Sequence, residues 1–423
     1  MNIFALWRPA LIAGALFTGC VTDSGNSSII PATDTESPHK YTNPAGDEFP
    51  ILGWYSIRGM ENQTPERYKE MRECGFNLSF PLVDSLSEVQ AALDASIGTG
   101  IKIIATCAEL ESATDSTIGV IGGHPQLAGY FFKDEPNCNI YPQLAEFVNR
   151  IRKTDDSKLL YLNLFPTYAG PALLGTDDYH EYVRRFIDEL GTGFVSYDHY
   201  SITADSLGNT RLNPDYYQNL EIIAEEAASA GIPFWAFALS TAHYSFPAAT
   251  RENLRLQIFS NLAYGAQGVE YFTYWQFPGL GDSKDVPITN AGERGSSWWH
   301  VRDLNREIQA LSSVFLGAEA LCVTHTGDSI PMGTRKLESL PDPIISLNST
   351  GGEGLLVSHL RNGDNDYLMI VNRDLHNRQQ VSVETKDNVL FIANDGERLP
   401  ASAVTPSTWL APGDYILYGW QQK

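Results

Sequence analysis

The fold is decided by a pattern that recurs along the chain and is easiest to see in residues 129–165, GYFFKDEPNCNIYPQLAEFVNRIRKTDDSKLLYLNLF. Short apolar and aromatic runs at both ends, 129–133 and 159–165, predict strands. Between them, apolar residues recur at positions i, i+3, i+4 and i+7 of one helix face, namely Leu144, Phe147, Val148 and Ile151. The stretch therefore predicts a strand–helix–strand unit.

The same alternation runs through most of the chain and predicts eight strands, at 49–57, 76–83, 101–107, 129–133, 159–165, 194–199, 233–239 and 269–275. Apolar strands that alternate with helices indicate a parallel sheet buried on both faces. Eight units in about 270 residues match a (β/α)8 TIM barrel. The rival is a doubly wound sheet, which would carry a phosphate-binding glycine loop after its first strand, and GWYSIRG (53–59) lacks that spacing. We therefore predict an α/β fold with a barrel at 48–318.

The pattern changes after about residue 318. Short strands separated by Gly, Asn and Asp turns follow, as in LLVSHL (355–360), YLMIVN (367–372) and YILY (415–418). No helical spacing interrupts them. We predict a small C-terminal antiparallel β-sandwich over 319–423.

The first residues indicate export. Arg8 precedes a short apolar run at 11–17, which ends in Phe-Thr-Gly-Cys20. This resembles a bacterial lipoprotein signal, which implies cleavage after residue 19 and a lipid on Cys20 that holds the protein to a membrane of the cell envelope. An ordinary secretory signal is the alternative. Residues 20–47 are rich in small polar residues, and we expect a flexible tether there.

Composition excludes several classes of function. The 423 residues carry 29 Lys and Arg against 51 Asp and Glu, a net charge of −22, which argues against a nucleic-acid partner. The cysteines of the folded part, Cys74, Cys107, Cys138 and Cys322, have neither CxxC spacing nor a histidine at zinc-ligand spacing. We expect no metal and no cofactor. Two alternatives remain for Cys107 and Cys138: a disulfide between them, or two buried free thiols.

If the chain forms a barrel, its chemistry lies where the strands end. The predicted strand ends carry mostly carboxylates and aromatic residues, including Asp84, Glu109, Asp134, Glu135, Asp198, Tyr200 and Trp275. Aromatic faces stack on sugar rings, and paired carboxylates cleave glycosidic bonds. This combination predicts a carbohydrate substrate.

Three stretches strengthen that reading: GYFFKDEP (129–136), YDHY (197–200) and AYGAQGVEYFTYW (263–275). They resemble the barrels of clan A glycoside hydrolases, most of all β-galactosidase-like members, and envelope lipoproteins of glycan-degrading bacteria. The resemblance covers roughly 50–318. In clan A, Asn-Glu-Pro closes the fourth strand and its Glu is the general acid/base, which implies that role for Glu135, with Asp134 in place of the Asn.

The resemblance fails at the seventh strand, where clan A carries its nucleophilic Glu. Here FWAFALSTAH (234–243) has no carboxylate. Asp198, at the end of the sixth strand, is the best candidate for the second catalytic group, with a hydrogen-bonding partner of Glu135 as its alternative role. Weaker candidates are Asp84, Glu109 and Glu270. Glu270 begins the eighth strand, on the face opposite Trp275.

Further residues are predicted to bind the substrate. Trp54 and Trp275 would stack on sugar rings, and five polar or aromatic residues would contact hydroxyl groups: Asp134, Asn163, His199, Tyr200 and His243. For each, the alternative is a structural role in the barrel. Lys133 would lower the pKa of Glu135 unless the chain bends at Pro136.

These features predict an exported glycoside hydrolase. One alternative is a non-catalytic glycan-binding lipoprotein on a degenerate barrel. Another is a structural envelope protein.

Overall fold

The computed structural model describes residues 39–280 and 282–422. Eight parallel strands close into a barrel in the order β1-β10-β9-β6-β5-β4-β3-β2. Their bounds are β1 Ile51–Arg58, β2 Leu78–Leu82, β3 Lys102–Ala105, β4 Leu127–Asp134, β5 Leu159–Leu164, β6 Val195–Tyr197, β9 Phe234–Leu239 and β10 Gly268–Phe272. A two-stranded hairpin follows β6, with β7 Ile202–Ala204 and β8 Thr210–Leu212. The predicted TIM barrel is confirmed.

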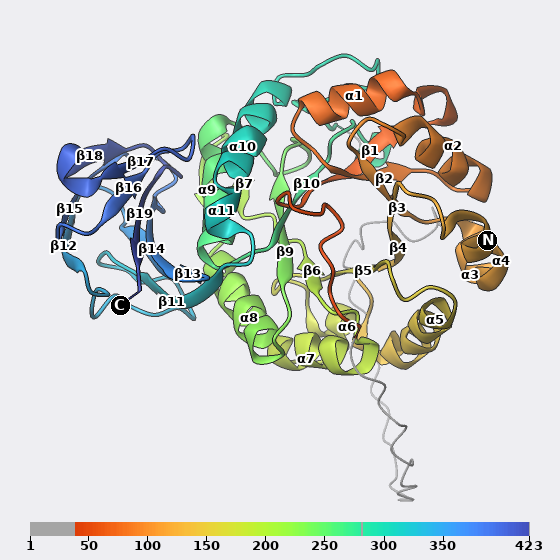
Figure 1. Cartoon of the computed structure of the whole chain (residues 1–423), viewed down its shortest axis with the longest axis horizontal. Coiled ribbons are helices and arrows are strands. Elements are labelled where there is room, and N and C mark those ends of the chain that lie inside the picture. The colour runs from red at the N-terminus through yellow and green to blue at the C-terminus, as the bar shows by residue number, and fades with distance from the viewer. Residues whose placement is uncertain (1–38, 281, 423) are drawn as a thin grey trace, which may run out of the picture. The chain divides into compact units, whose positions relative to one another are not determined.

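Helices surround the strands (Figure 1). They are α1 Pro65–Glu73, α2 Leu86–Ser96, α3 Ala108–Ser112, α4 Thr114–Ile121, α5 Tyr141–Thr154, α6 Pro171–Leu174, α7 Tyr179–Leu190, α8 Tyr216–Ser229, α9 Arg251–Ala263, α10 Trp298–Ala310 and α11 Ser312–Phe315. Local sequence signals fix several of their starts. Thr64 caps α1 ahead of Pro65, and Ser85 forms a reciprocal capping box with Glu88 at the start of α2.

The barrel interior is packed with side chains and leaves no open pore. Trp54 of β1 lies at its centre, and its indole ring contacts the rings of Phe80, Phe131, Tyr161 and Phe237, with centroids 4.6 to 5.5 Å away. A second and larger apolar cluster fills the space between the strands and the helices. The strands are therefore covered on both faces, as their continuous apolar sequences predict.

Residues 39–47, which the composition assigned to the tether, pack against the barrel instead. The Tyr41 ring contacts Phe194 and Trp235, and its hydroxyl accepts a hydrogen bond from Trp235 Nε1 at 3.3 Å. Lys102 Nζ donates to the Pro44 carbonyl at 2.8 Å. Trp235 and Phe194 lie at the starts of their strands, so this segment covers the amino-terminal end of the barrel. The His39 N–H also donates to the Gly191 carbonyl at 3.0 Å.

Antiparallel strands form the C-terminal part of the chain. A six-stranded sheet has the order β11-β13-β14-β19-β16-β17 and a three-stranded sheet the order β12-β15-β18. The bounds are β11 Glu319–His325, β12 Ile344–Thr350, β13 Leu355–Asn362, β14 Asn365–Asn372, β15 Gln379–Thr385, β16 Leu390–Ile392, β17 Arg398–Pro400, β18 Ser407–Leu410 and β19 Tyr415–Gln421. An apolar cluster between the two sheets includes Leu355, Val383 and Trp420. The predicted sandwich is confirmed.

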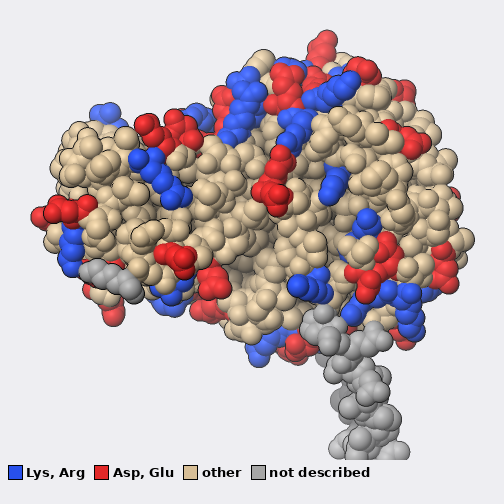
Figure 2. Space-filling view, viewed as in Figure 1, with Lys and Arg blue, Asp and Glu red and all other residues tan. Residues whose placement is uncertain are grey.

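The predicted signal peptide (1–19) and the lipid site at Cys20 lie outside the described residues. Within the described part, no helix is both long and apolar enough to span a bilayer. Cys74, Cys107, Cys138 and Cys322 are all free thiols. Figure 2 shows acidic and basic side chains interspersed on the visible face.

Candidate active site

Glu135 follows directly after the carboxyl end of β4. Its backbone has a φ of 42°, in the left-handed region that costs a non-glycine residue about 1–2 kcal/mol. The Glu135 N–H donates to the Asn163 carbonyl of β5 at 2.9 Å, and Pro136 behind it is buried. Such strain persists only where neighbours enforce it, and it collects at functional sites. Because the chain bends here, the direction of the Glu135 side chain no longer follows the in–out alternation of the residues in β4.

Asn163 holds two further carboxyl groups beside Glu135. Its Nδ2 donates to Asp198 Oδ1 at 2.8 Å and to Asp134 Oδ1 at 3.3 Å. Asp134 and Asn163 are paired in register across β4 and β5, and Asp198 follows β6, the next strand around the barrel. Two carboxyl groups from the end of β4 and one from the end of β6 therefore meet around Asn163 of β5, which lies between these strands. The sequence prediction located all three carboxyl groups at strand ends.

Glu135 and Asp198 share a hydrogen bond. Burial is the main cause that raises the pKa of Glu135, and the charges of Asp198 and Asp134 add to it, so that the pKa reaches about 11. Glu135 therefore carries its proton at neutral pH. This is the state that a general acid requires.

The other two carboxyl groups are also harder to ionise than usual. Burial and the neighbouring Asp198 charge raise the pKa of Asp134 to about 7, against opposing effects of Asn163 and of the Lys133 ammonium. Burial also raises the pKa of Asp198, while hydrogen bonds with Asn163, Tyr200 and Glu135 favour its ionised form. The Lys133 charge thus acts on Asp134 rather than on Glu135, and the bend after β4 separates it from the acid.

The second predicted role of Asp198, as the partner of Glu135, matches this geometry. The hydrogen bond lets the two groups share one proton. Asp198 also stays the candidate for the second catalytic group, because both carboxyl groups lie at the carboxyl ends of the strands that flank β5.

Tyrosines surround the carboxyl groups. The Tyr200 side chain hydrogen-bonds Asp198, and the charges of Asp198 and Glu135 are among the causes that raise the pKa of Tyr168 after burial. Those of Asp134 and Glu135 act in the same way on Tyr55. Tyr168, in the loop between β5 and α6, is 48% exposed and presents the most open ring of the three. It was not predicted, although its position just after a barrel strand is the signal that could have found it.

The two predicted tryptophan platforms have no free face. Trp54 is 2% exposed and lies in the barrel interior among four other rings. Trp275 is 3% exposed and packs with the outer cluster, where the Arg67 guanidinium lies 5.2 Å from its ring centroid. Both surfaces on which a sugar was expected to stack are covered by protein side chains.

The two predicted histidines lie next to the site but are engaged elsewhere. His199 Nε2 is 3.2 Å from Asp215 Oδ1, and its ring contacts Tyr168. His243 Nδ1 bonds the Thr241 carbonyl at 3.0 Å, and burial lowers the pKa of its imidazole. Both side chains are buried, so they support the rim rather than line an open surface.

The weaker candidates for a second carboxylate do not join the cluster. Glu109 accepts a hydrogen bond from the Leu86 N–H at 3.1 Å and so caps α2. Asp84 is exposed beside Glu88. Ser240 and Thr241 follow β9, so no carboxylate stands at the end of this strand. Glu270 lies in the barrel interior, where it contacts Tyr161 and Ser196.

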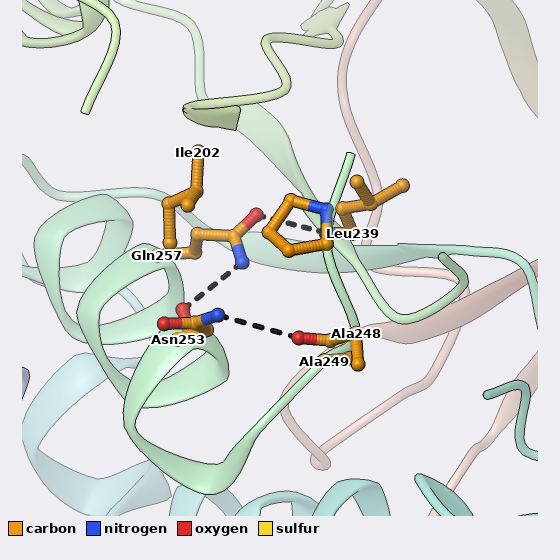
Figure 3. A pocket seen from close by; sticks show the side chains of 7 residues that line it. Ile202, Leu239, Ala248, Ala249, Asn253 and Gln257 are labelled. Atoms are coloured by element: carbon orange, nitrogen blue, oxygen red, sulfur yellow. Dashed lines mark hydrogen bonds between the residues drawn. The ribbon is translucent and has the colours of Figure 1, made fainter. Parts of the chain in front are cut away.

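The cavities found elsewhere do not enlarge this site. One of about 10 Å³ lies between β9 and α9, where Gln257 bonds both Leu239 N and Asn253 O (Figure 3). It can hold about one water molecule, not a sugar. A hollow of about 480 Å³ on the sandwich is lined mainly by β14, β16 and β19. Among the described residues, no three His, Cys, Asp or Glu side chains are grouped to hold a metal ion.

A scan against protein-family models and a search of the curated proteins both give no match. Solved structures do match. A glycoside hydrolase family 5 protein from Bacteroides vulgatus has 11% identity and a TM-score of 0.53, over 88% of this chain and 89% of that one. A second, described as a glycoside hydrolase, has 9% identity and a TM-score of 0.52, over 88% of this chain and 92% of that one. The likeness shows that this chain shares the fold of these hydrolases across more than its barrel.

Proposed function

We propose that this protein is a glycoside hydrolase in which Glu135 is the general acid. The observation that carries the proposal is the position of Glu135, a residue with strained backbone at the carboxyl end of β4, beside Asp134 and Asp198, both of which Asn163 holds. The fold shared with glycoside hydrolases supports it. Exposed aromatic surface on Tyr168 beside the acid provides a face for a sugar ring.

In the proposed reaction Glu135 donates its proton to the glycosidic oxygen as the bond to the anomeric carbon breaks. The negative charge on the Asp134–Asp198 pair stabilises the positive charge that develops on the sugar ring. Water then adds to the anomeric carbon, and Asp198 accepts the proton that the water releases. The hydrogen bond between Asp198 and Glu135 returns that proton to the acid, so the site is restored.

The test uses the dependence of acid catalysis on the leaving group. Purified protein is assayed against a panel of 4-nitrophenyl and 2,4-dinitrophenyl glycosides of common hexoses and pentoses, and against oligosaccharides of the sugars that are cleaved. Glu135→Gln is expected to lower kcat on oligosaccharides by about 10²–10⁴-fold. It should lower kcat far less on the dinitrophenyl glycosides, because that leaving group needs little protonation.

Glu146→Gln is the matched control, because Glu146 is an exposed residue of α5 outside the cluster. Equal loss on both leaving groups, or no loss, would contradict the acid role of Glu135. Glycan binding without hydrolysis of any member of the panel would favour the non-catalytic glycan-binding alternative.

We also propose export and a lipid on Cys20, on the strength of the Phe-Thr-Gly-Cys20 sequence alone. Metabolic labelling with a fatty acid should mark the native chain and not Cys20→Ala. Equal labelling of both would contradict the anchor.

A further inference from the structure

A fourth carboxyl group lies inside the barrel, and the proposed reaction does not use it. Glu270 of β10 is 0% exposed. The Tyr161 hydroxyl donates to its Oε1, and Ser196 Oγ lies 2.9 Å from its Oε2. Its register neighbours on the adjoining strands are Leu52 and Phe237, both apolar. Burying an ionised carboxylate among apolar side chains costs free energy unless the group is paired with a charge or neutralised by a proton.

Two side chains connect Glu270 to the candidate active site. Ser196 Oγ lies 3.0 Å from Asn163 Oδ1, and Ser196 and Asn163 are paired in register across β6 and β5. Asn163 Nδ2 then reaches Asp198 and Asp134. The path from the interior carboxyl to the rim carboxyls is therefore continuous.

The orientation of the Asn163 amide follows from its partners. The opposite orientation would place Oδ1 against carboxyl oxygens of Asp198 and Asp134, where an N–H is needed. With Nδ2 toward those two groups, Oδ1 faces Ser196 and can only accept a hydrogen bond.

The number of hydroxyl protons available in this network determines the protonation state of Glu270. The Ser196 hydroxyl has one proton to donate and lies near three oxygens, Asn163 Oδ1 at 3.0 Å, Glu270 Oε2 at 2.9 Å and the Tyr161 hydroxyl at 3.3 Å. The Tyr161 hydroxyl and a protonated Glu270 can themselves donate, whereas Asn163 Oδ1 can only accept, so the serine proton goes to Asn163. Ser196 can therefore bond Glu270 only as an acceptor, which needs a proton on Glu270. Every member of the chain is satisfied when Glu270 is the neutral acid. If Glu270 ionises, it competes with Asn163 for the serine proton.

We propose that Glu270, as a neutral carboxylic acid, is a positioning residue that acts through Ser196 and Asn163 to hold the rim carboxyls Asp198 and Asp134. It directs the serine proton onto the amide, and the amide then keeps both N–H groups on the two carboxyls. The consequence for catalysis rests on the proposed function, but the positioning itself does not.

The surroundings of Glu270 agree with this state. Burial raises its pKa to about 8, and the charges of Asp198 and Asp134 act in the same direction. The hydrogen bond from the Tyr161 hydroxyl opposes the shift without reversing it.

The first test needs no substrate. Protein labelled with ¹³C at aspartate Cγ is titrated by NMR, with Asp134→Asn and Asp198→Asn variants for assignment. Glu270→Gln, which can still donate to Ser196 and accept from Tyr161, should leave the pKa values of both rim carboxyls as in the native protein. Ser196→Ala and Glu270→Leu should raise the rim pKa values by at least about half a unit, because the Asn163 bonds that favour the ionised forms weaken.

In the Asp134→Asn background, which removes the rim group that itself titrates near pH 7, the Asp198 signal should show a step near pH 8 as Glu270 ionises, and adding Glu270→Gln should abolish that step. A Glu270 that only fills space would leave the rim pKa values alike in Glu270→Gln and Glu270→Leu. Unchanged rim pKa values in Ser196→Ala, or a step that persists when Glu270→Gln is added to Asp134→Asn, would overturn the proposal. Ser196→Ala removes one hydroxyl only, so the test does not depend on the fold tolerating Glu270→Leu.

The second test is kinetic and uses whichever glycoside the panel identifies. Glu270→Gln should keep kcat within about twofold, whereas Ser196→Ala and Glu270→Leu should lower kcat roughly tenfold with little change in KM. If Glu270→Gln behaves like Glu270→Leu, the positioning role of the neutral acid is contradicted. If the native protein cleaves nothing, the proposed function fails, and the NMR titration still decides the role of Glu270.

Discussion

Glu135 and Asp198 share a hydrogen bond although β5 separates their strands, β4 and β6, in the barrel. Asn163 of β5 lies between these strands, and its Nδ2 donates a hydrogen bond to Asp198 Oδ1 at 2.8 Å. Two carboxyl groups in such contact cannot both be ionised at low cost, so they hold one proton between them. The proposed chemistry depends on this arrangement.

The charge of Asp198 sets the acidity of Glu135. Asp198→Asn removes a negative neighbour, so we expect the pKa of Glu135 to fall. In the pH profile of kcat/KM the alkaline limb should move to lower pH by about one unit or more, since the acid then loses its proton earlier. Glu146→Gln should leave that limb in place. An unchanged alkaline limb in Asp198→Asn would show that Asp198 does not control the acid.

Glu135 lowers the stability of the fold at neutral and alkaline pH. Its pKa in the folded protein is raised from 4.5 to about 11, so the unfolded chain loses this proton first. The free energy of unfolding therefore falls as the pH rises above about 4.5. Glu135→Gln removes this dependence.

Thermal unfolding of the native protein and of Glu135→Gln at pH 5 and pH 8 measures the effect. Relative to the native protein, the variant should gain about 5 °C more in Tm at pH 8 than at pH 5, which corresponds to about 4 kcal/mol. A gain that is equal at both, or larger at pH 5, would mean that Glu135 is ionised in the folded state.

Tyr168 is expected to bind the sugar by its ring. Tyr168→Ala should weaken binding of the substrate by roughly 3–10-fold, in line with one aromatic contact of about 0.5–1.5 kcal/mol, and Tyr168→Phe should retain most of the affinity. Calorimetric titration with the cleaved glycan, in a Glu135→Gln background, reports the change. Trp409→Ala removes a similarly exposed ring on the sandwich (52%) and should have no effect. Equal losses at the two sites would argue against a platform at Tyr168.

Tyr41 holds the amino-terminal segment to the barrel. Tyr41→Ala should lower the free energy of unfolding by about 2–4 kcal/mol, because it leaves Trp235 and Phe194 uncovered. Urea unfolding measures the loss, and kcat should not change, since the contact lies at the end of the barrel opposite Glu135. No loss of stability would mean that residues 39–47 behave as the tether that their composition suggested.

The barrel and the three rim carboxyls could be predicted because both depend on local signals. Apolar runs and helical spacing identify the units, and parallel strands bring their carboxyl ends to one edge. Asp134, Glu135 and Asp198 therefore meet without any knowledge of side-chain packing.

Other features depend on which way a side chain points. The direction of Trp54 and Trp275 is set by the closed barrel, and the register shift in β4 between Phe131 and Lys133 changes the alternation just before the acid. Ser196 and Tyr161 stand two residues before Asp198 and Asn163 on the same strands, so period-two alternation could have placed them inside. Their link to Glu270 requires all three strands in position.

The proposed reaction requires Glu135 to hold a proton at neutral pH. NMR titration of protein labelled with ¹³C at glutamate Cδ, with Glu135→Gln to assign the signal, measures this directly. We expect a Glu135 signal that stays in the protonated position through pH 8 and moves only at higher pH. A signal that titrates between pH 4 and pH 5, as in an exposed glutamate, would contradict it.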